Sequence, residues 1–161
     1  MDDMISMSPI GIIRTPFQSI EGMPIQPAGA ADVPGTVEIR PEYEEGLDGL
    51  AGFSHIILLY AFHLSRGYRL TVKPFLDDEM HGVFATRAPR RPNPIGLSVV
   101  RLVQVEGCTL KVRGVDMVDG TPLLDVKPFV PQFDVPQVER IGWLEKNLEG
   151  LDQTRADSRF R

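Results

Sequence analysis

The sequence predicts a mostly β protein: a single-sheet antiparallel β-barrel with a short C-terminal helix. Short runs of β-branched or alternating apolar residues recur along the chain, and glycine and proline separate them, which is typical of strands and turns. The connections are too short for the repeated crossover helices of a parallel sheet. A sheet of many short strands commonly closes on itself. At 161 residues with 42% hydrophobic residues, the chain suits one domain with its own core.

Eight segments carry the strand pattern. In chain order they are SPIGIIRT, TVEIR, FSHIILLYAFH, RLTVKP, GVFAT, LSVVRLVQVEG, TLKVRGVDM and PLLDVKP. Residues 19–35 are rich in proline, glycine and alanine and lack periodicity, so we expect a long loop of the kind that often serves binding. Residues 41–47 are expected to form one helical turn, because Pro41 would begin it and glycines follow near its end.

The C-terminal part predicts a helix followed by a tail. In VERIGWLEKNLEGL, apolar residues recur at helical spacing, namely Val138, Ile141, Leu144, Leu148 and Leu151. This spacing predicts an amphipathic helix packed on the barrel or on a partner. The expected organisation is a barrel domain over residues 1–136, the helix over 137–151, and a frayed polar tail over 152–161.

Composition limits the compartment and the classes of partner. A net charge of −5 and a pI near 5.2 argue against broad, charge-driven nucleic-acid binding. Residues 1–15 lack the basic start and apolar centre of a signal peptide, and no apolar run approaches the length of a membrane span. The sequence therefore predicts a soluble cytoplasmic protein. The single cysteine, Cys108, fits a reducing compartment, and its place in an apparent strand predicts a small buried side chain.

The segment GVFATRAPRRPNPIGLS, residues 82–98, is the strongest candidate for chemistry. Its two RPNP prolines stiffen the backbone and leave carbonyl acceptors, which suits the amino group of an adenine ring. Gly96 permits either a close approach or a positive φ. Arg87, Arg90 and Arg91 suit a ligand carboxylate or a phosphate. The alternative is a proline-rich hairpin connection with solvated arginines.

A second candidate is DMVDGTPLLDVKP, residues 116–128. Its DGTP tetrapeptide has strong turn chemistry between two strands, so a purely structural turn is one interpretation. The other is a ligand loop, in which Asp116, Asp119 and Asp125 accept hydrogen bonds from ribose hydroxyls or a ligand ammonium, and one of them acts as a base.

The histidines do not predict a metal site. His55 and His63 are eight residues apart, which separates them by ~26 Å in a strand or ~12 Å in a helix. His81 has no partner at zinc-ligand spacing. His63, at a strand end, is the better candidate for a site residue, and His55 is expected in the core. No glycine-rich turn of a dinucleotide fold, phosphate-binding loop or nucleophile elbow is found.

Taken together, these segments resemble the TrmO or TsaA-like β-barrel tRNA methyltransferases. The resemblance runs over residues 8–133, and its most specific part is GVFATRAPRRPNPIGLS, joined in the expected order by IGIIRTPF, FSHIILLYAFH and DMVDGTPLLDVKPF. It implies a single-sheet barrel, a homodimer and S-adenosyl-L-methionine as cofactor. It also implies an enzyme that methylates N6 of threonylcarbamoyl-adenosine next to the anticodon of tRNA.

The resemblance also implies the site residues. It places the cofactor against an early loop, a strand end, the arginine loop and the turn; the residues are Gln26, Pro27, Ala28, Gly29, His63, Leu64, Arg91, Met117, Val118, Asp119 and Gly120. Asp119 is our hypothesis for a general base. Arg87 and Arg90 are expected to meet RNA phosphates or the threonine carboxylate of the modified base.

Two departures from the family pattern keep other functions open. Pro24-Ile25-Gln26 lacks an arginine found in many members, and residues 77–81 are acidic where many members have a glycine- and arginine-bearing loop. Both changes remove positive charge near the expected RNA face. A non-catalytic S-adenosyl-L-methionine-binding module, a methyltransferase for another substrate, and a small RNA-binding barrel without cofactor are therefore the alternatives.

Overall fold

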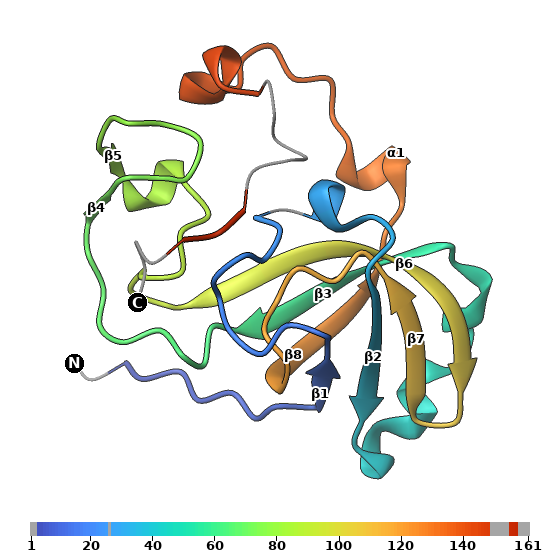
Figure 1. The fold of residues 1–161 in the computed structure, drawn as a ribbon. Coiled ribbons are helices and arrows are strands. Elements are labelled where there is room, and N and C mark those ends of the chain that lie inside the picture. Colours follow the sequence, from blue (N-terminus) through green and yellow to red (C-terminus); the bar gives the residue numbers. More distant parts are fainter. Residues whose placement is uncertain (1–2, 26, 149–154, 158–161) are drawn as a thin grey trace.

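The computed structural model describes residues 3–25, 27–148 and 155–157. Within them, six strands close into a barrel in the order β1-β2-β7-β6-β3-β8, and every neighbouring pair is antiparallel (Figure 1). The prediction of a single-sheet antiparallel barrel is confirmed. No helix among these residues is long and apolar enough to cross a membrane.

The elements are short apart from β6. The barrel strands are β1 (Gly11–Arg14), β2 (Pro34–Ile39), β3 (His55–Ala61), β6 (Ile95–Glu106), β7 (Thr109–Arg113) and β8 (Thr121–Pro128). A separate two-stranded sheet pairs β4 (Thr71–Val72) with β5 (His81–Gly82). The helices are α1 (Pro131–Asp134) and the 3-10 helices η1 (Pro27–Ala30), η2 (Pro41–Leu47), η3 (Leu50–Gly52), η4 (Val83–Ala85) and η5 (Gly142–Lys146).

Alternating side chains fill the barrel. Along β3, every second residue is buried, as the two-residue period of a strand requires. Ile56 and Leu58 of this strand are fully buried, as are Ile13 of β1 and Leu123 of β8. Removing such side chains from water is the main favourable contribution to folding. The expected helical turn at residues 41–47 is confirmed as η2, with proline at its start.

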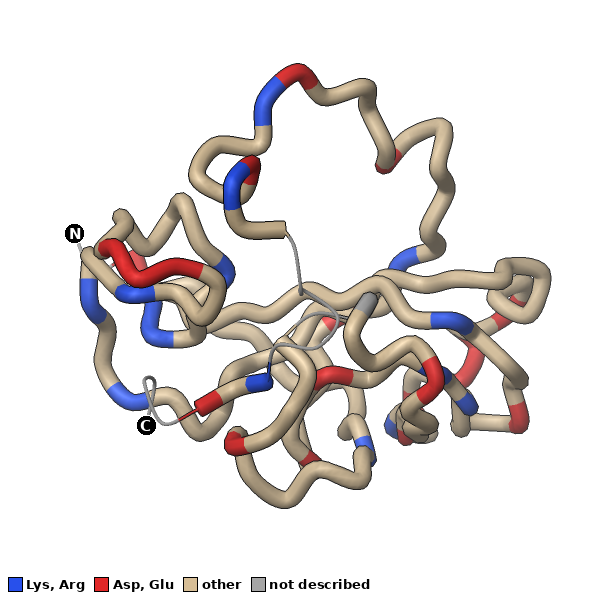
Figure 2. The backbone as a smooth tube through the Cα atoms, turned by 45° about the horizontal axis from the view of Figure 1, so that its top comes forward, with Lys and Arg blue, Asp and Glu red and all other residues tan. Residues whose placement is uncertain are grey.

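The chain between β3 and β6 leaves the barrel and returns to it. It carries β4, β5 and η4, which share a small apolar cluster of Val72, Val83 and Ala88 with Phe75 packed against it. Figure 1 shows this segment beside one end of the barrel, with η5 next to it. Residues 77–79, the acidic run, lie in the β4–β5 connection, with Lys and Arg positions nearby (Figure 2).

The segment GVFAT does not form the expected strand. Only Gly82 belongs to β5, and η4 follows at once. Val83 turns inward and is 1% exposed, and Thr86 closes the turn by donating from its backbone N–H and its hydroxyl to the carbonyl of Val83, at 3.1 and 2.9 Å. Burial of Val83 and this pair of hydrogen bonds outweigh the β propensity of the segment.

The C-terminal helix is much shorter than expected. Within the described part of residues 137–151, only η5 is helical, and Val138 and Ile141 are 64% and 40% exposed. Gly142 has a φ of +63°, outside the helical region, and packing that stabilises an α-helix along its length is missing at Val138 and Ile141. Residues 149–151 of the predicted helix lie outside the described residues.

The expected frayed tail is paired where it is described. Pro24 and Arg155 form an isolated antiparallel bridge, and the N–H of Ala156 donates to the carbonyl of Met23 at 2.8 Å. Ala156 is 8% exposed and packs with Met23 and Val118. The backbone of residues 22–24 thus provides partners that polar composition alone does not predict.

His55 and Cys108 lie in surroundings that differ from those predicted. His55, expected in the core, is the first residue of β3 and only partly buried, with Nδ1 2.9 Å from the hydroxyl of Ser54. Cys108 lies in the turn between β6 and β7 rather than in a strand. Its side chain is half-buried, and burial together with Glu44 raises the pKa of its thiol. Both residues lie where a strand meets a turn, and side chains there keep partial contact with solvent.

Candidate functional site

A cavity of about 720 Å³ opens where the barrel meets the segment between β3 and β6. This volume lies within the usual range of small-molecule sites. Its walls are mostly apolar and come from eight separate stretches of the described chain. The lining residues are Ile20, Met23, Pro24, Ile25, Tyr60, Phe62, His63, Leu64, Ser65, Pro74, Phe75, Leu76, Phe84, Ala85, Thr86, Arg87, Ala88, Pro89, Arg91, Ile95, Gly96, Leu97, Asp116, Met117, Val118, Thr121, Trp143, Leu144, Leu148 and Ala156.

A chain of hydrogen bonds enters the cavity from the barrel core. The hydroxyl of Ser98 on β6 donates to Oδ1 of Asp116 at 2.6 Å, and the hydroxyls of Tyr60 and Ser98 lie 2.9 Å apart. Because Ser98 has one proton and gives it to Asp116, the proton between the two hydroxyls comes from Tyr60. The hydrogen bonds therefore run from Tyr60 through Ser98 to the carboxylate.

Burial shifts both ends of this chain. It raises the pKa of Asp116 to about 6, against the lowering effects of the hydrogen bond from Ser98 and the nearby guanidinium of Arg87. Burial also raises the pKa of Tyr60 further above its usual range, so the phenol keeps its proton. A carboxylate that titrates near neutrality in a cleft is a candidate for acid–base chemistry.

Gly96 makes room for the Tyr60 ring. The two residues face each other across β3 and β6, and a Cβ at position 96 would overlap the ring atoms of Tyr60. Gly96 is not among the glycines with positive φ, so of the two roles open from sequence, close approach is the one found. The ring also packs edge-on against Phe62, with centroids 5.6 Å apart.

The arginines of residues 82–98 have three different surroundings. Arg91 lines the cavity and donates from Nη1 to the carbonyls of Thr86 and Ala88, at 3.0 and 3.1 Å. Arg87 also lines the cavity, and its positive charge acts to lower the pKa of Asp116. Arg90 does not line it, and Nε of Arg90 is buried with no hydrogen-bond partner in the described part of the chain. Arg91 therefore shapes the loop as well as facing the ligand space.

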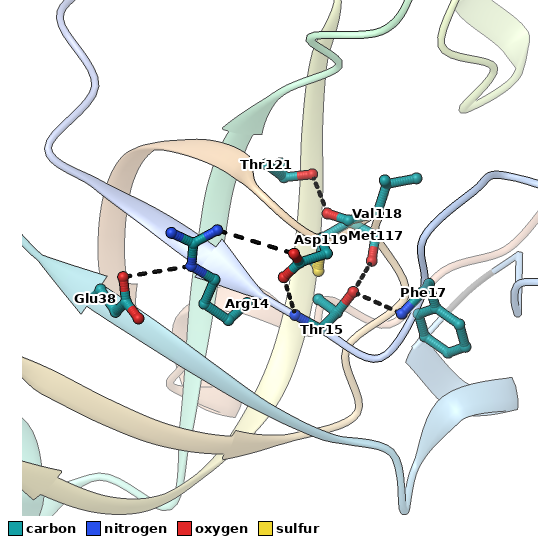
Figure 3. A network of polar contacts seen from close by, with 8 residues as sticks. All are labelled: Arg14, Thr15, Phe17, Glu38, Met117, Val118, Asp119 and Thr121. Atoms are coloured by element: carbon teal, nitrogen blue, oxygen red, sulfur yellow. Dashed lines mark hydrogen bonds and ion pairs between the residues drawn. The ribbon is translucent and has the colours of Figure 1, made fainter.

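Asp119 holds the turn to the end of β1, as Figure 3 shows. Its Oδ1 accepts from the N–H of Thr15 at 3.0 Å, and its Oδ2 lies 3.9 Å from Nη1 of Arg14. The hydroxyl of Thr15 donates to the carbonyl of Met117 at 2.8 Å. This network orients Met117 and Val118, which line the cavity, while Asp119 itself is not among the described residues lining it.

The cavity brings together many of the residues expected from sequence, and these are His63, Leu64, Arg87, Arg91, Asp116, Met117 and Val118. Four others lie outside its described lining: Gly29, Arg90, Asp119 and Gly120. Pro27 and Ala28 belong to η1, and Gln26 is outside the described residues. Asp125 is on β8, with Oδ2 2.8 Å from Nζ of Lys127, and is also absent from the lining.

Sequence reasoning missed three residues of the site: Tyr60, Ser98 and Trp143. The indole of Trp143 donates to the carbonyl of Ala85 at 2.8 Å and stacks on His81 with centroids 4.7 Å apart. His81 is in turn 2.8 Å from Oδ2 of Asp77, a contact that lowers the pKa of Asp77. The sequence signal for Tyr60 and Ser98 is a tyrosine that faces a glycine across two paired strands, with a serine two residues after the glycine. That pattern can be recognised only once the register of β3 and β6 is known.

Comparison with known proteins agrees with this arrangement. The family model described as the tRNA-methyltransferase O N-terminal domain matches residues 12–135. A "probable S-adenosyl-L-methionine-binding protein" of Pyrococcus abyssi is 57% identical over 98% of this chain and 85% of its own length. The mouse tRNA (adenine(37)-N6)-methyltransferase is 40% identical over 80% of this chain, which spans 32% of that protein.

The same likeness extends to solved structures. The crystal structure of TrmO from Pseudomonas aeruginosa superposes with a TM-score of 0.73 at 42% identity, covering 87% of this chain and 62% of that one. The chain thus spans less than two thirds of that structure and about a third of the mouse protein. With a family match over most of its length and these relatives, the chain belongs to the tRNA-methyltransferase O N-terminal domain family.

Proposed function

We propose that this chain binds S-adenosyl-L-methionine in the 720 Å³ cavity and methylates N6 of threonylcarbamoyl-adenosine at position 37 of tRNA. The observation that carries the proposal is the cavity itself, in which the arginine loop and Met117 and Val118 converge. The names of relatives support the cofactor and the tRNA adenine. The cytoplasmic location predicted from sequence is kept as part of this proposal.

The residues present fit such a cofactor. Apolar side chains from Ile95 and Leu97 on β6 and from Met117 and Val118 suit a purine ring. Arg91 supplies positive charge for the carboxylate of an amino acid moiety. S-adenosyl-L-methionine supplies an electrophilic methyl group on a sulfonium, so the protein needs mainly to hold the two reactants in line.

The acidic run beside the cavity is the feature that favours a second function. Residues 77–79 lie in the β4–β5 connection, on the segment whose Phe75 and Leu76 line the cavity, and negative charge there opposes RNA phosphates. A non-catalytic S-adenosyl-L-methionine-binding module would have the same cavity and no need for RNA contacts. The experiment below separates the two functions.

The test uses methyl-labelled S-adenosyl-L-methionine with tRNA that does or does not carry threonylcarbamoyl-adenosine. We expect label on N6 of the modified tRNA alone. Cofactor binding by calorimetry without label on any tRNA would favour the binding module. Label on another nucleoside or molecule would indicate a methyltransferase for another substrate, and no cofactor binding would favour the RNA-binding barrel.

Arg87 and Arg90 are proposed to contact the tRNA. Replacement of each by alanine should weaken tRNA binding and reduce its salt dependence by about one unit of slope per lost phosphate contact. The matched control is Arg101→Ala, since Arg101 is exposed on β6 and does not line the cavity. An unchanged salt slope in the Arg87 and Arg90 variants would contradict phosphate contact.

A homodimer that completes the site is the remaining part of the proposal. Apolar side chains that line the cavity yet stay exposed, such as Leu64 at 51% and Leu97 at 46%, are compatible with a partner covering them. Sedimentation velocity at micromolar protein should give twice the mass of one chain. A single-chain mass with full methyl transfer would exclude a dimer-dependent site.

A further inference from the structure

We propose, on the basis of the proposed function, that Asp116 is the general base of the site and that Ser98 and Tyr60 are its positioning residues. Asp116 accepts the N6 proton of the substrate as the new N–C bond forms and the C–S bond of the methyl donor breaks. The sulfur keeps the electron pair and leaves as a neutral thioether. The positive charge of the sulfonium and the negative charge of the carboxylate are both lost, so the step is balanced in charge.

Asp116 is the group in the cavity suited to take a proton. Among the described lining residues it is the one carboxylate. Arg87 and Arg91 remain protonated in proteins, and Tyr60 is held protonated by burial. His63 is the other acceptor in the lining, and it is exposed at the end of β3 rather than held by the core.

The barrel fixes the orientation of this carboxylate. Tyr60 and Ser98 are 4% and 1% exposed, and they come from adjacent strands whose register pairs Tyr60 with Gly96 and Leu58 with Ser98. Both hydroxyls therefore belong to buried side chains on paired strands, which orient a functional group better than a loop does. The hydrogen bond from Ser98 engages Oδ1, and we assign the incoming proton to Oδ2.

The basicity of Asp116 suits the task. A carbamoylated adenine nitrogen is a weak nucleophile, so removal of its proton during attack lowers the barrier. With its pKa raised to about 6 by burial, Asp116 is ionised at neutral pH and still a stronger base than an exposed aspartate. Tyr60 on β3 and Arg87 on the arginine loop interact with the charge of Asp116. Arg91 on the arginine loop and His63 after β3 are the other charged or titratable groups in the described lining of the cavity.

The main test is Asp116→Asn, which keeps the shape and removes the base. We expect turnover on modified tRNA to fall by about 100-fold or more, with the Kd of S-adenosyl-L-methionine changed by less than about threefold. The matched control is Asp48→Asn, an exposed aspartate outside the cavity lining. Turnover within about threefold of wild type would overturn the role. So would a Kd raised more than about tenfold with turnover kept, because it would place Asp116 against the cofactor instead.

A readout independent of activity tests the positioning residues. Carbon-13 NMR titration of aspartate carboxyls should give Asp116 a pKa near 6, and Ser98→Ala should move it upward because the lowering hydrogen bond is lost. Tyr60→Phe should move it upward by less. The His63→Asn variant should leave the pKa of Asp116 unchanged in this titration. The apparent pKa of methyl transfer, measured as turnover against pH, should also be unchanged in this variant. A wild-type pKa in the usual aspartate range, or no shift in Ser98→Ala, would overturn the proposal.

The proposed function and the base role of Asp116 are overturned by different results. If the wild-type chain methylates modified tRNA and Asp116→Asn does so equally well, the base role alone is wrong. If the wild-type chain transfers no methyl group to any tRNA while it binds S-adenosyl-L-methionine, the proposed function is wrong and the base role is overturned with it.

Discussion

Asp116 and Asp119 lie in one short segment between β7 and β8, and their carboxylates face different parts of the molecule. Asp116 meets the hydroxyl of Ser98 from the barrel core and lines the cavity. Asp119 meets the N–H of Thr15 and the guanidinium of Arg14 at the end of β1. The same residue type is thus a candidate base at one end of the segment, and at the other end it holds the turn to β1. Residue type alone does not separate these roles.

The largest expected effect comes from exchanging the two carboxylates for amides. Asp116→Asn should lower turnover about 100-fold. Asp119→Asn should change it by less than about threefold, because asparagine keeps an oxygen that can accept the hydrogen bond from the N–H of Thr15. Single-turnover methyl transfer at saturating cofactor measures both. A large loss in Asp119→Asn with a small one in Asp116→Asn would restore the hypothesis that Asp119 is the base.

Gly96→Ala tests whether the Tyr60 ring, which begins the hydrogen-bond chain to Asp116, needs the space left by Gly96. An added Cβ would overlap the Tyr60 ring, so we expect a loss of about 1–3 kcal/mol in the free energy of unfolding, as for other overpacked cores. Urea denaturation measures it. The matched control is Gly82→Ala, where a Cβ meets nothing within 4 Å. Equal stability in the two variants would mean that the ring moves aside at no cost.

The pH dependence of the free energy of unfolding tests the burial of Asp116. Burial raises the pKa of Asp116 to about 6 from an ordinary 3.8, so the folded chain holds this proton more tightly than the unfolded chain. The stabilisation is complete below the ordinary pKa and is lost as the pH rises through about 6. Asp116→Asn should flatten this part of the profile, measured by urea unfolding between pH 4 and pH 8. An unchanged slope would show that another group causes it.

The smallest effect is expected at the cavity rim, at Trp143. It is the one tryptophan of the sequence and lines the cavity, so its fluorescence should change when S-adenosyl-L-methionine is added. Trp143→Phe loses the hydrogen bond to Ala85, which is worth ~1 kcal/mol or less at a partly exposed site, and cofactor affinity should fall by a few fold. Trp143→Leu also loses the stacking on His81 and should fall further. Equal affinity in all three proteins would exclude a role for the rim.

The barrel was predictable because its evidence is local. Alternation along FSHIILLYAFH and LSVVRLVQVEG places one face of each strand inside, and short connections exclude crossover helices. The family motifs likewise indicated where His63, Arg91 and Met117 would contribute. These residues do line one cavity.

The chain of hydrogen bonds from Tyr60 to Asp116 was not predictable, because it depends on the register of β3 and β6. Tyr60 and Ser98 are 38 positions apart, and a shift of one residue in the pairing of β3 and β6 would place one of them on the opposite face. The prediction of a C-terminal helix was wrong although it rested on local evidence. The apolar residues do recur at helical spacing, but Val138 and Ile141 remain exposed and Gly142 adopts a positive φ.

The bridge between Pro24 and Arg155 gives the folding unit and the functional unit different boundaries. Every barrel strand lies before residue 129, so a shortened chain that ends at residue 136 keeps the whole sheet. It would nevertheless lose Ala156, Trp143 and Leu144 from the cavity wall. Such a truncation should remain folded and bind cofactor poorly, and a site transplanted to another barrel would have to include this returning C-terminal segment.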